Sequence, residues 1–566
     1  MDRIVQSYMD SFLKSQDIDE KSQSKQFEMF SSYCAIEQLY SENFNPADVV
    51  IGEGDDCGID AVAILVNGMM ITSQEEIDDL LDINKKLSEI NFIFVQAKTS
   101  SSFDYGDMGT FGAGVKDFFS DNPQMRRNDA ITEKSKLVGY IFSKATYIKK
   151  KPVCSLYYVT TGKWVDDQNC VGRMEIAKND LLDLNIFSNV IYTPVDADLL
   201  QKYYRNTIDV IETEIEFSNK TVLPEIPGVK QSYLGYIDSQ SYLKLITGEN
   251  GEIRKSVFYD NVRDFQGEDN PVNHEMEESL KSDSDKFVLL NNGVTVICKE
   301  LSSIGNKFTL TDYQIVNGCQ TSHVIFNNRD IISSELQIPI KLIETEVDDT
   351  VNMIIKATNR QTQVPDEQLI ALNEFHRKLE AFYGTFTGSG RLYYERRSKQ
   401  YNYGTDIEKV RIVSISTQIK AVASMFYDKP HLASRYYGRL LNSIDGIFND
   451  AHQLLPYYTC AFTLYRLEYL FRNKSIPAQY RKFKYFILMM IKYDLAEGEI
   501  PQMNANKMNK FCEKILSVAS NNSELIEEVN KLTSLLDKHV EDITSTESTK
   551  MATLVDNLKK EFVVIK

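Results

Sequence analysis

Short apolar runs of strand type alternate with segments of helical pattern over the first two hundred residues, and this alternation most constrains the fold. Residues 59–66 form one such run, and Asn67-Gly68, which follows it, is a strong signal for a tight hairpin turn. Residues 91–95 form a second run that continues into Gln96-Ala97-Lys98. Further elements of this kind are strands at 152–160 and 187–193 and helices at about 73–87 and 133–149. Strands that alternate with helices predict one α/β domain here.

The pattern changes twice beyond this domain. Residues 220–285 are richer in Gly, Pro, Asn and Asp, which indicates a junction with irregular loops. A second α/β-like stretch follows, with strands expected at 287–298 and 308–316 and a helix after Gly318. From about residue 366 the pattern is mostly helical. The predicted fold is therefore mixed α/β, with domains at 1–215, 216–400 and 401–566.

The last helical segment, 523–562, carries a regular apolar stripe. Its members follow one another at alternating spacings of four and three, and they are Leu525, Val529, Leu532 and Leu536. This spacing is typical of a helical bundle or a coiled-coil seam. Packing within the chain is favoured over a dimer zipper.

Composition and charge limit the classes of function. The chain has 81 acidic and 63 basic side chains, a formal net charge of −18, so it is no histone-like coat for nucleic acid. If it binds nucleic acid, it needs a local basic groove or a bridging metal ion. Eight scattered cysteines without metal-ligand spacing indicate a reducing compartment. The N-terminus lacks the apolar core of a signal peptide, and the apolar run at 486–491 is far below the ~20 residues of a membrane helix. We expect a cytoplasmic protein.

Polar residues with metal chemistry gather around the second strand. Gln96 and Lys98 lie two apart, so both side chains should leave the same face of the strand. Asp60 begins the preceding strand, and Glu28 lies on an upstream helix. Two carboxylates and an amide oxygen are hard donors that suit Mg²⁺ or Mn²⁺, and such an ion polarises a phosphate and activates water. Lys98 would orient that water or stabilise the charge on the phosphate. The alternative is that Asp60 caps a turn and that Lys98 is a solvated strand end.

The order of these residues resembles the PD-(D/E)XK nuclease superfamily. GIDAVAI supplies the Asp and VQAK supplies the second half of the motif, and the resemblance covers about residues 20–200. It implies a restriction-endonuclease-like domain with Glu28, Asp60, Gln96 and Lys98 as catalytic residues. The chain departs from the pattern at Gln96, where many members carry an acid, and this puts the metal affinity in question. Glu37 is the alternative first-helix acid, although Glu28 fits the "FE" pattern better.

Three amide-rich phrases stand out in the centre of the chain: NNGVTV, IVNGCQT and ATNRQTQV. Exposed amides at a strand-to-helix turn can bind a base or a phosphate, helped by the helix N-terminus. The candidate binding residues are Asn292, Asn317, Gln320, Thr321, Asn359 and Gln361. The alternative is that these residues stitch loops together, because Asn-Gly is ordinary turn chemistry.

A basic and aromatic segment, 391–401, follows these phrases. Arg391, Arg396 and Arg397 are interleaved with tyrosines, a combination that suits backbone charge and base stacking in nucleic acid. The alternative is a helix face whose cations pair with acids such as Glu395. For a second basic stretch, 472–484, the paired state is favoured.

Together with LYYERRSKQY at 392–401, the three amide-rich phrases look like the abortive infection phage resistance (AIPR) family, over about residues 220–500. The resemblance implies a bacterial antiphage protein. The combined prediction is a metal-dependent nuclease, with DNA favoured over RNA as substrate. Its AIPR module would act as a sensor or a nucleic-acid-binding control element that responds to a phage-derived trigger. A homodimer is plausible because double-strand cutting needs two sites. The alternative is a catalytically silent nuclease fold in a sensor that acts through a partner.

Overall fold

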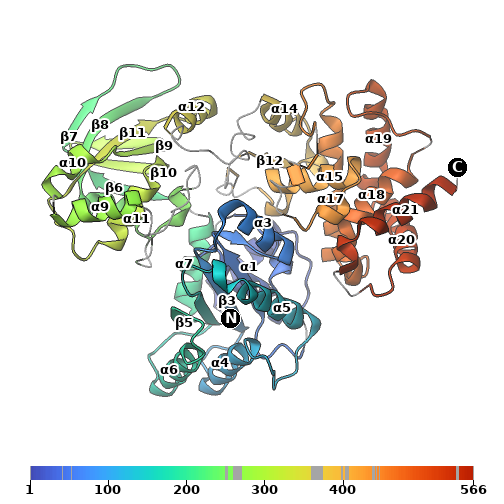
Figure 1. The fold of residues 1–566 in the computed structure, drawn as a ribbon, viewed down its shortest axis with the longest axis horizontal. Helices are drawn as coiled ribbons and strands as arrows, with labels where there is room; N and C mark the ends of the chain where they lie inside the picture. Colours follow the sequence, from blue (N-terminus) through green and yellow to red (C-terminus); the bar gives the residue numbers. More distant parts are fainter. Residues whose placement is uncertain are drawn as a thin grey trace. The chain divides into compact units, whose positions relative to one another are not determined.

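The chain forms two compact units. The computed structural model describes residues 2–40, 42–52, 54–208, 210–248, 251, 253–258, 271–282, 284–358, 374–396, 400–401, 407–435, 440–441, 443–444, 446–496, 498–543 and 547–564. One unit combines Met1–Ile208 with Glu374–Lys566, and the other is Asp209–Asn373 (Figure 1). The N-terminal domain and the C-terminal helices therefore belong to one unit, although 165 residues separate them along the chain.

The N-terminal domain is built on a mixed sheet in the order β2-β1-β3-β4-β5. β1 pairs antiparallel with β2 and β3, whereas β3, β4 and β5 run parallel. The strands are Ala61–Val66, Met69–Met70, Ile90–Lys98, Val153–Thr160 and Asn189–Val195. The helices α1 to α7 are Arg3–Ser15, Gln23–Ile36, Gln74–Asn84, Tyr105–Phe118, Asp129–Ser143, Gln168–Leu182 and Ala197–Ile208. The mixed α/β class predicted from the sequence is confirmed.

Local sequence signals set the first hairpin. Asn67 and Gly68 have φ angles of 50° and 79°, and this left-handed pair joins β1 to β2 as the dipeptide predicted. Ser73 Oγ then accepts a hydrogen bond from Glu76 N at 3.3 Å and begins α3. The helix ends at Asn84 rather than at 87, because Lys85 adopts a left-handed φ of 58°.

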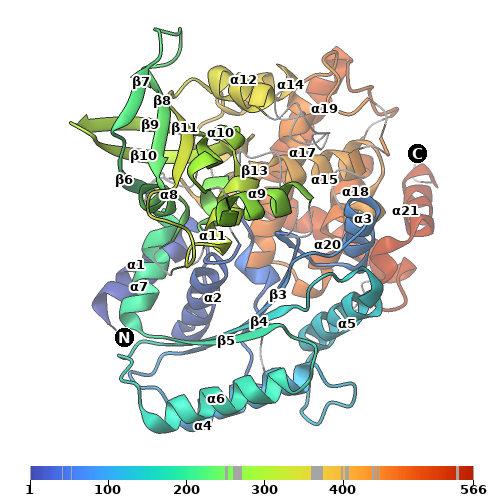
Figure 2. The same ribbon diagram turned by 60° about the vertical axis from the view of Figure 1, so that its left-hand side comes forward.

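Helices cover both faces of this sheet, as Figure 2 shows, with α4 and α6 on one side and α2 and α7 on the other. Successive residues of β3 therefore enter different cores. Phe92 and Phe94 pack with α4, α5 and α6, whereas Ile93 and Val95 pack with α1, α2 and α7. Two buried faces explain why the strand reads as a continuous apolar run rather than an alternating one.

The C-terminal part of the first unit is mostly helical. Its helices α14, α15 and α17 to α21 are Glu374–Tyr383, Ile415–Phe426, Leu455–Arg472, Lys484–Asp494, Asn506–Ser520, Asn522–His539 and Ala552–Val564. Two short strands, β12 (Tyr393–Glu395) and β13 (Ile412–Ser414), pair in parallel. The apolar stripe of α20 is fully buried against α18, α19 and α21, so it packs within the chain, as favoured from the sequence.

Ion pairs of a single polarity connect this helical part to the N-terminal domain. In each pair of this set, residues 1–208 supply the acid and residues 374–566 supply the cation. The pairs are Asp17–Arg472, Glu20–Lys474, Asp48–Arg481, Glu75–Lys550, Glu76–Lys420, Asp79–Arg435 and Glu133–Lys482. The basic stretch 472–484 is thus paired, and its partners include acids of the N-terminal domain.

The second unit is a sheet in the order β6-β10-β9-β11-β8-β7, antiparallel except between β9 and β11. In chain order, β6 to β11 are Glu212–Glu216, Asn219–Val222, Gln231–Asp238, Val294–Ile304, Lys307–Asn317 and Gln337–Glu344. The helices α8 to α12 are Ser239–Ile246, Pro271–Ser282, Phe287–Leu290, Cys319–Asn327 and Asp348–Thr358.

One strand prediction in this unit is partly wrong. Residues 287–298 were expected as a single strand, but Phe287–Leu290 is a helical turn and β9 begins at Val294. Asn291 Oδ1 accepts a hydrogen bond from Gly293 N at 2.8 Å and makes the turn between them. By contrast, α11 begins directly after Gly318, as predicted. Across the part of the chain that the structure describes, no helix has the length and apolar character that a membrane crossing needs.

Candidate active site

The backbone of β3 holds Asp60 beside Gln96. Asp60 N donates a hydrogen bond to Val95 O at 2.9 Å, and Ala97 N donates to Asp60 Oδ2 at 2.7 Å. These bonds involve the residues before and after Gln96, so the Asp60 carboxylate lies at the end of β3 next to it. Gln96 and Lys98 share a strand face because they alternate with Val95 and Ala97, which belong to the opposite core.

The side chain of Gln96 carries a buried, unpartnered oxygen. Gln96 is 4% exposed, and its Oε1 has no hydrogen-bond partner among the residues that the structure describes. A buried acceptor left without a partner costs about 1–3 kcal/mol, so such an atom suggests a role in ligand binding. The amide nitrogen of Gln96 abuts Gly58, where an added Cβ would lie 3.2 Å from Nε2.

The Asp60 carboxyl group has a raised pKa, and a nearby cation would lower it again. Burial raises the pKa of Asp60 from 3.8 to about 7. The bond from Ala97 N and the charge of Lys98 lower this pKa, whereas the charges of Glu28 and Asp56 raise it. Two further carboxylates therefore act on Asp60, and a bound dication would favour its ionised form.

The two candidate first-helix acids lie in different surroundings. Glu28 lies within α2, and Glu37 directly follows its last residue. Glu28 is partly buried on α2 and accepts a hydrogen bond from Ser24 Oγ at 3.2 Å. Burial raises the pKa of Glu28, Asp56 raises it further, and Lys98 lowers it. Glu37, at the C-terminal end of α2, is 8% exposed and lies beside Tyr33. Burial raises the pKa of Tyr33, and the charge of Glu37 raises it further. Glu28 is thus the acid near Asp60 and Lys98.

The loop that precedes Asp60 has an unusual backbone. Gly54, Asp55, Cys57 and Gly58 have φ angles of 67°, 47°, 58° and 73°, all in the left-handed region. Non-glycine residues rarely adopt such angles, and strain of this kind is often found at functional sites. Asp56 Oδ1 steadies the loop by accepting a hydrogen bond from Gly58 N at 2.7 Å.

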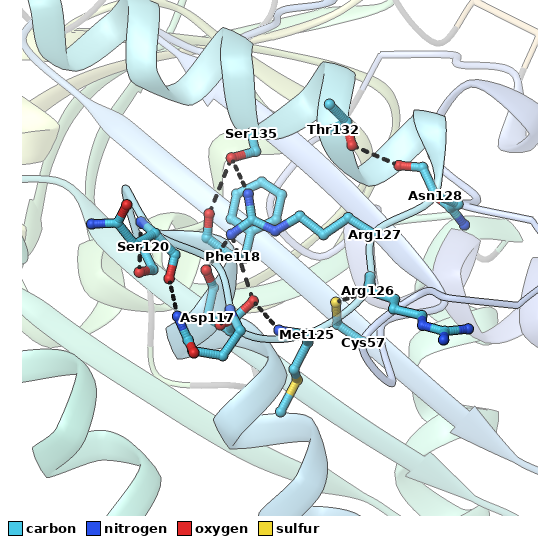
Figure 3. A network of polar contacts seen from close by, with 12 residues as sticks. Cys57, Asp117, Phe118, Ser120, Met125, Arg126, Arg127, Asn128, Thr132 and Ser135 are labelled. Atoms are coloured by element: carbon cyan, nitrogen blue, oxygen red, sulfur yellow. Dashed lines mark hydrogen bonds and ion pairs between the residues drawn. The ribbon is translucent and has the colours of Figure 1, made fainter.

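A polar network between α4 and α5 holds the other side of this loop (Figure 3). Cys57 Sγ donates to Arg126 O at 3.1 Å, and Asn128 N donates to Asp55 O at 2.8 Å. Arg127 Nη1 in turn donates to Ser135 Oγ at 3.0 Å. The position of the loop, and with it that of Asp60, therefore depends on the segment 125–128.

Gly114 of α4 is where the helix and the loop approach most closely. A Cβ at this position would lie 1.9 Å from Cys57 O, so Gly114→Ala must displace the loop backbone. We expect the variant to lose about 1–3 kcal/mol of stability, as overpacked sites do, because the loop that leads to Asp60 must shift. Thermal unfolding of the full chain measures this loss.

Gly139→Ala is the matched control for this substitution. Gly139 is exposed on α5 and a Cβ there meets nothing within 4 Å, so alanine should stabilise the helix by about 0.5–1 kcal/mol. If Gly114→Ala behaved like Gly139→Ala, the close approach of α4 to the loop would be wrong.

The residues around Asp60 fit a hydrated divalent cation. In the described portion of the chain, no group of three or more His, Cys, Asp or Glu side chains could hold a metal ion. Mg²⁺, however, commonly takes only one or two carboxylates and keeps several waters. Asp60 and the unpartnered Gln96 Oε1 are oxygen donors of this kind, and Glu28 is close enough to act on the pKa of Asp60.

Two of the candidate binding residues in the centre of the chain, Gln320 and Thr321, are used in internal contacts. Gln320 Oε1 accepts a hydrogen bond from Asn273 Nδ2 at 2.9 Å, and Thr321 Oγ1 accepts one from Asn291 Nδ2 at 3.2 Å. Asn317 ends β10, whereas Asn292 is exposed in the turn before β9. Asn359 and Gln361 lie outside the described residues. Gln320 and Thr321 therefore connect α11 to its neighbours, which agrees with the alternative that these residues hold loops together.

Arg391 and Arg396 of the basic segment 391–401 are also engaged within the helical part. Arg391 Nη1 donates to Tyr383 O at 3.1 Å, and its guanidinium lies 4.8 Å from the centre of the Tyr393 ring. Arg396 is 6% exposed and its Nε pairs with Glu380 Oε2 at 2.5 Å. This is the paired alternative, with Glu380 in place of Glu395 as partner. Arg397 lies outside the described residues.

Two groups near the site were not predicted from the sequence. Asp56 acts on the pKa values of both Asp60 and Glu28, and its position four residues before Asp60 was an available signal. Tyr158 lies on β4 as the register partner of Gln96. No pattern in the sequence reveals this, because the register of two strands sixty residues apart is set by tertiary packing.

Comparison with known proteins assigns the second half of the chain to a family. The model of the family described as AIPR protein matches residues 258–562, which is more than half of the chain. This match covers parts of both units and leaves out the sheet domain that carries Asp60. No curated protein and no solved structure matches the chain. The chain thus belongs to the AIPR family, and this membership implies a part in phage defence by abortive infection.

Proposed function

We propose that the protein is a metal-dependent nuclease that acts in phage defence, with DNA favoured over RNA as its substrate. One observation carries the proposal: Ala97 N holds the partly buried Asp60 carboxylate at the end of β3, next to Gln96 with its unpartnered Oε1, and Lys98 follows on the same strand face. Asp60, Gln96 and Glu28 would hold Mg²⁺ or Mn²⁺. When bound, this ion polarises a phosphate and lowers the pKa of water.

The chain's own residues supply the rest of the chemistry. The Lys98 ammonium stabilises the negative charge that builds up on the phosphate during attack, and it orients the attacking water. The Asp60 carboxyl must give up its proton before it can bind a cation, so its raised pKa sets the pH range of activity. The Gly54–Gly58 loop fixes where Asp60 begins its strand and keeps Gln96 in place from the other side.

The test is cleavage of plasmid DNA and of RNA by the purified full chain, with Mg²⁺ or Mn²⁺ and with EDTA. Lys98→Ala should lower the rate by about 10²–10³-fold, because it removes one preorganised charge from the transition state. Lys136→Ala is the matched control. It removes an exposed ammonium from α5, and we expect it to cleave within twofold of the wild-type rate.

Equal cleavage by wild type and Lys98→Ala would contradict the assignment, since it would point to a contaminant or to another site. Cleavage of RNA with DNA left intact would change the substrate and keep the site.

A sensor that acts through a partner is the second candidate. It is favoured by the finding that, within the described residues, no three His, Cys, Asp or Glu side chains could hold a metal. This candidate predicts salt-sensitive binding of nucleic acid and no cleavage by wild type with either ion.

A further inference from the structure

We propose that Tyr158 is a further positioning residue of this site, whose buried hydroxyl binds a water molecule of the hydrated divalent cation held by Asp60 and Gln96. The inference rests on the proposed function, and it adds a residue that neither the sequence motif nor the family match contains.

The strand register brings Tyr158 next to Gln96. β3 and β4 are parallel, and Gln96 and Tyr158 are Cα partners across the pair. Partners in a parallel pair present their side chains on the same face of the sheet. Tyr158 accordingly belongs to the core that contains Phe92 and Phe94, and its side chain is fully buried.

Both side chains of this pair lack a partner for a polar atom. The hydroxyl of Tyr158 and the Oε1 of Gln96 are buried, and neither has a hydrogen-bond partner within the described part of the chain. Buried polar groups are almost always hydrogen-bonded, so two exceptions on adjacent strands and on one face of the sheet indicate a shared ligand. Tyr192 on β5 shows the ordinary outcome in the same core, because its hydroxyl donates to Met108 O at 3.0 Å.

The charges around the hydroxyl indicate a cation rather than an anion. Three carboxylates, those of Asp107, Asp104 and Asp60, act on the hydroxyl. The hydroxyl itself is a neutral group that can donate or accept a hydrogen bond. A phosphate would be repelled by these acids, whereas the waters around a dication would be attracted and can donate to the phenolic oxygen.

The rings that pack on Tyr158 fix its direction. Phe103 and Phe111 lie with ring centroids 6.0 Å and 6.4 Å from that of Tyr158. A tyrosine held in this way cannot readily turn its hydroxyl toward solvent, so the oxygen would be preorganised for its ligand.

The test compares Tyr158→Phe with Tyr192→Phe in the full chain. Mn²⁺ affinity is measured by calorimetry without nucleic acid, and the melting temperature is measured with EDTA and with saturating Mn²⁺. Tyr158→Phe should weaken Mn²⁺ binding by about tenfold, because it removes one hydrogen bond to a charged hydrate. Its melting temperature in EDTA should equal or exceed that of the wild type, since the lost hydroxyl had no partner. Tyr192→Phe breaks a formed bond, so it should lower the melting temperature equally in both conditions and leave Mn²⁺ affinity unchanged.

The outcomes separate this proposal from the proposed function. If wild type binds Mn²⁺ and Tyr158→Phe binds it equally well, the role of Tyr158 is overturned and the nuclease proposal stands. The same follows if Tyr158→Phe is destabilised in EDTA as Tyr192→Phe is, because its hydroxyl would then have a structural partner. If wild type binds neither Mn²⁺ nor Mg²⁺, the metal site itself is overturned.

Discussion

Asp60→Asn should make the metal-free protein more stable at pH 8 and at the same time abolish metal-dependent cleavage. Folding raises the pKa of Asp60 from 3.8 to about 7, chiefly through burial. Between these two values the folded protein binds more protons than the unfolded chain, so this group's contribution to stability falls as pH rises from about 4 to 7. At pH 8 the ionised carboxylate costs a few kcal/mol, which asparagine avoids while its Oδ1 still accepts the bond from Ala97 N.

Unfolding in EDTA at pH 5 and pH 8 measures this effect. In the wild type, ionisation of Asp60 lowers the free energy of unfolding between pH 5 and pH 8. The Asp60→Asn variant should not show this loss. Asp121→Asn is the control, since Asp121 is exposed in a loop and its substitution should change stability by less than about 0.5 kcal/mol. An Asp60→Asn variant less stable than wild type at pH 8 would mean that the carboxylate has a favourable partner in the metal-free protein.

Cleavage should be lost because a neutral amide cannot replace the carboxylate charge at the cation. We expect at least a 10³-fold loss of rate at pH 8. In the wild type, affinity for Mn²⁺ should rise between pH 6 and pH 8, because the cation must displace the proton of Asp60. An Asp60→Asn protein that cleaves at the wild-type rate would remove Asp60 from the mechanism.

Arg481→Ala should give a large loss of stability, because Arg481 takes part in the ion pairs that join the N-terminal domain to the C-terminal helices. Arg481 pairs with Asp48 at 2.7 Å and with Glu468 at 2.9 Å, and Lys484 also pairs with Glu468. Burial raises the pKa of Glu468, but Lys484 and Arg481 outweigh this effect and hold it well below its usual range. Because the Glu468 side chain is only 12% exposed, removing Arg481 leaves a poorly compensated charge and should cost about 3 kcal/mol.

Lys474→Ala is the matched control for this prediction. Its side chain is 77% exposed and pairs with Glu20 at 3.1 Å, so we expect a loss of no more than about 0.5 kcal/mol. Calorimetric unfolding of the full chain should show a melting temperature that is a few degrees lower for Arg481→Ala and nearly unchanged for Lys474→Ala. Equal effects would mean that the Asp48–Arg481–Glu468 contacts are as solvated as the Lys474 pair.

This network also connects to the candidate site. Asp48 lies two residues before Val50, which bridges to Ala61, and Ile51 N donates to Asp60 O at 2.9 Å. Loss of the Arg481 contacts should therefore disturb the position of Asp60 as well as lower the overall stability.

Features fixed by neighbouring residues were predictable from the sequence. The Asn67-Gly68 hairpin, the Ser73 cap and the helix after Gly318 depend on the left-handed φ angles or side-chain hydrogen bonds of residues that lie next to one another. The grouping of Gln96 with Lys98 follows from the two-residue period of a strand. Residues 287–290 were misjudged because a four-residue apolar run suits a buried strand and a helical turn equally well.

The sequence by itself thus determined the α/β class, the local turns and the motif of Asp60, Gln96 and Lys98. Only the tertiary structure decided that residues 374–566 form one unit with the N-terminal domain. It also decided that Arg396 forms an ion pair with Glu380 and that Tyr158 is the register partner of Gln96. The physical reason is the same in each case. These contacts join residues far apart in the chain or strands whose register is free, and they are chosen by burial and charge pairing in the folded state rather than by local preference.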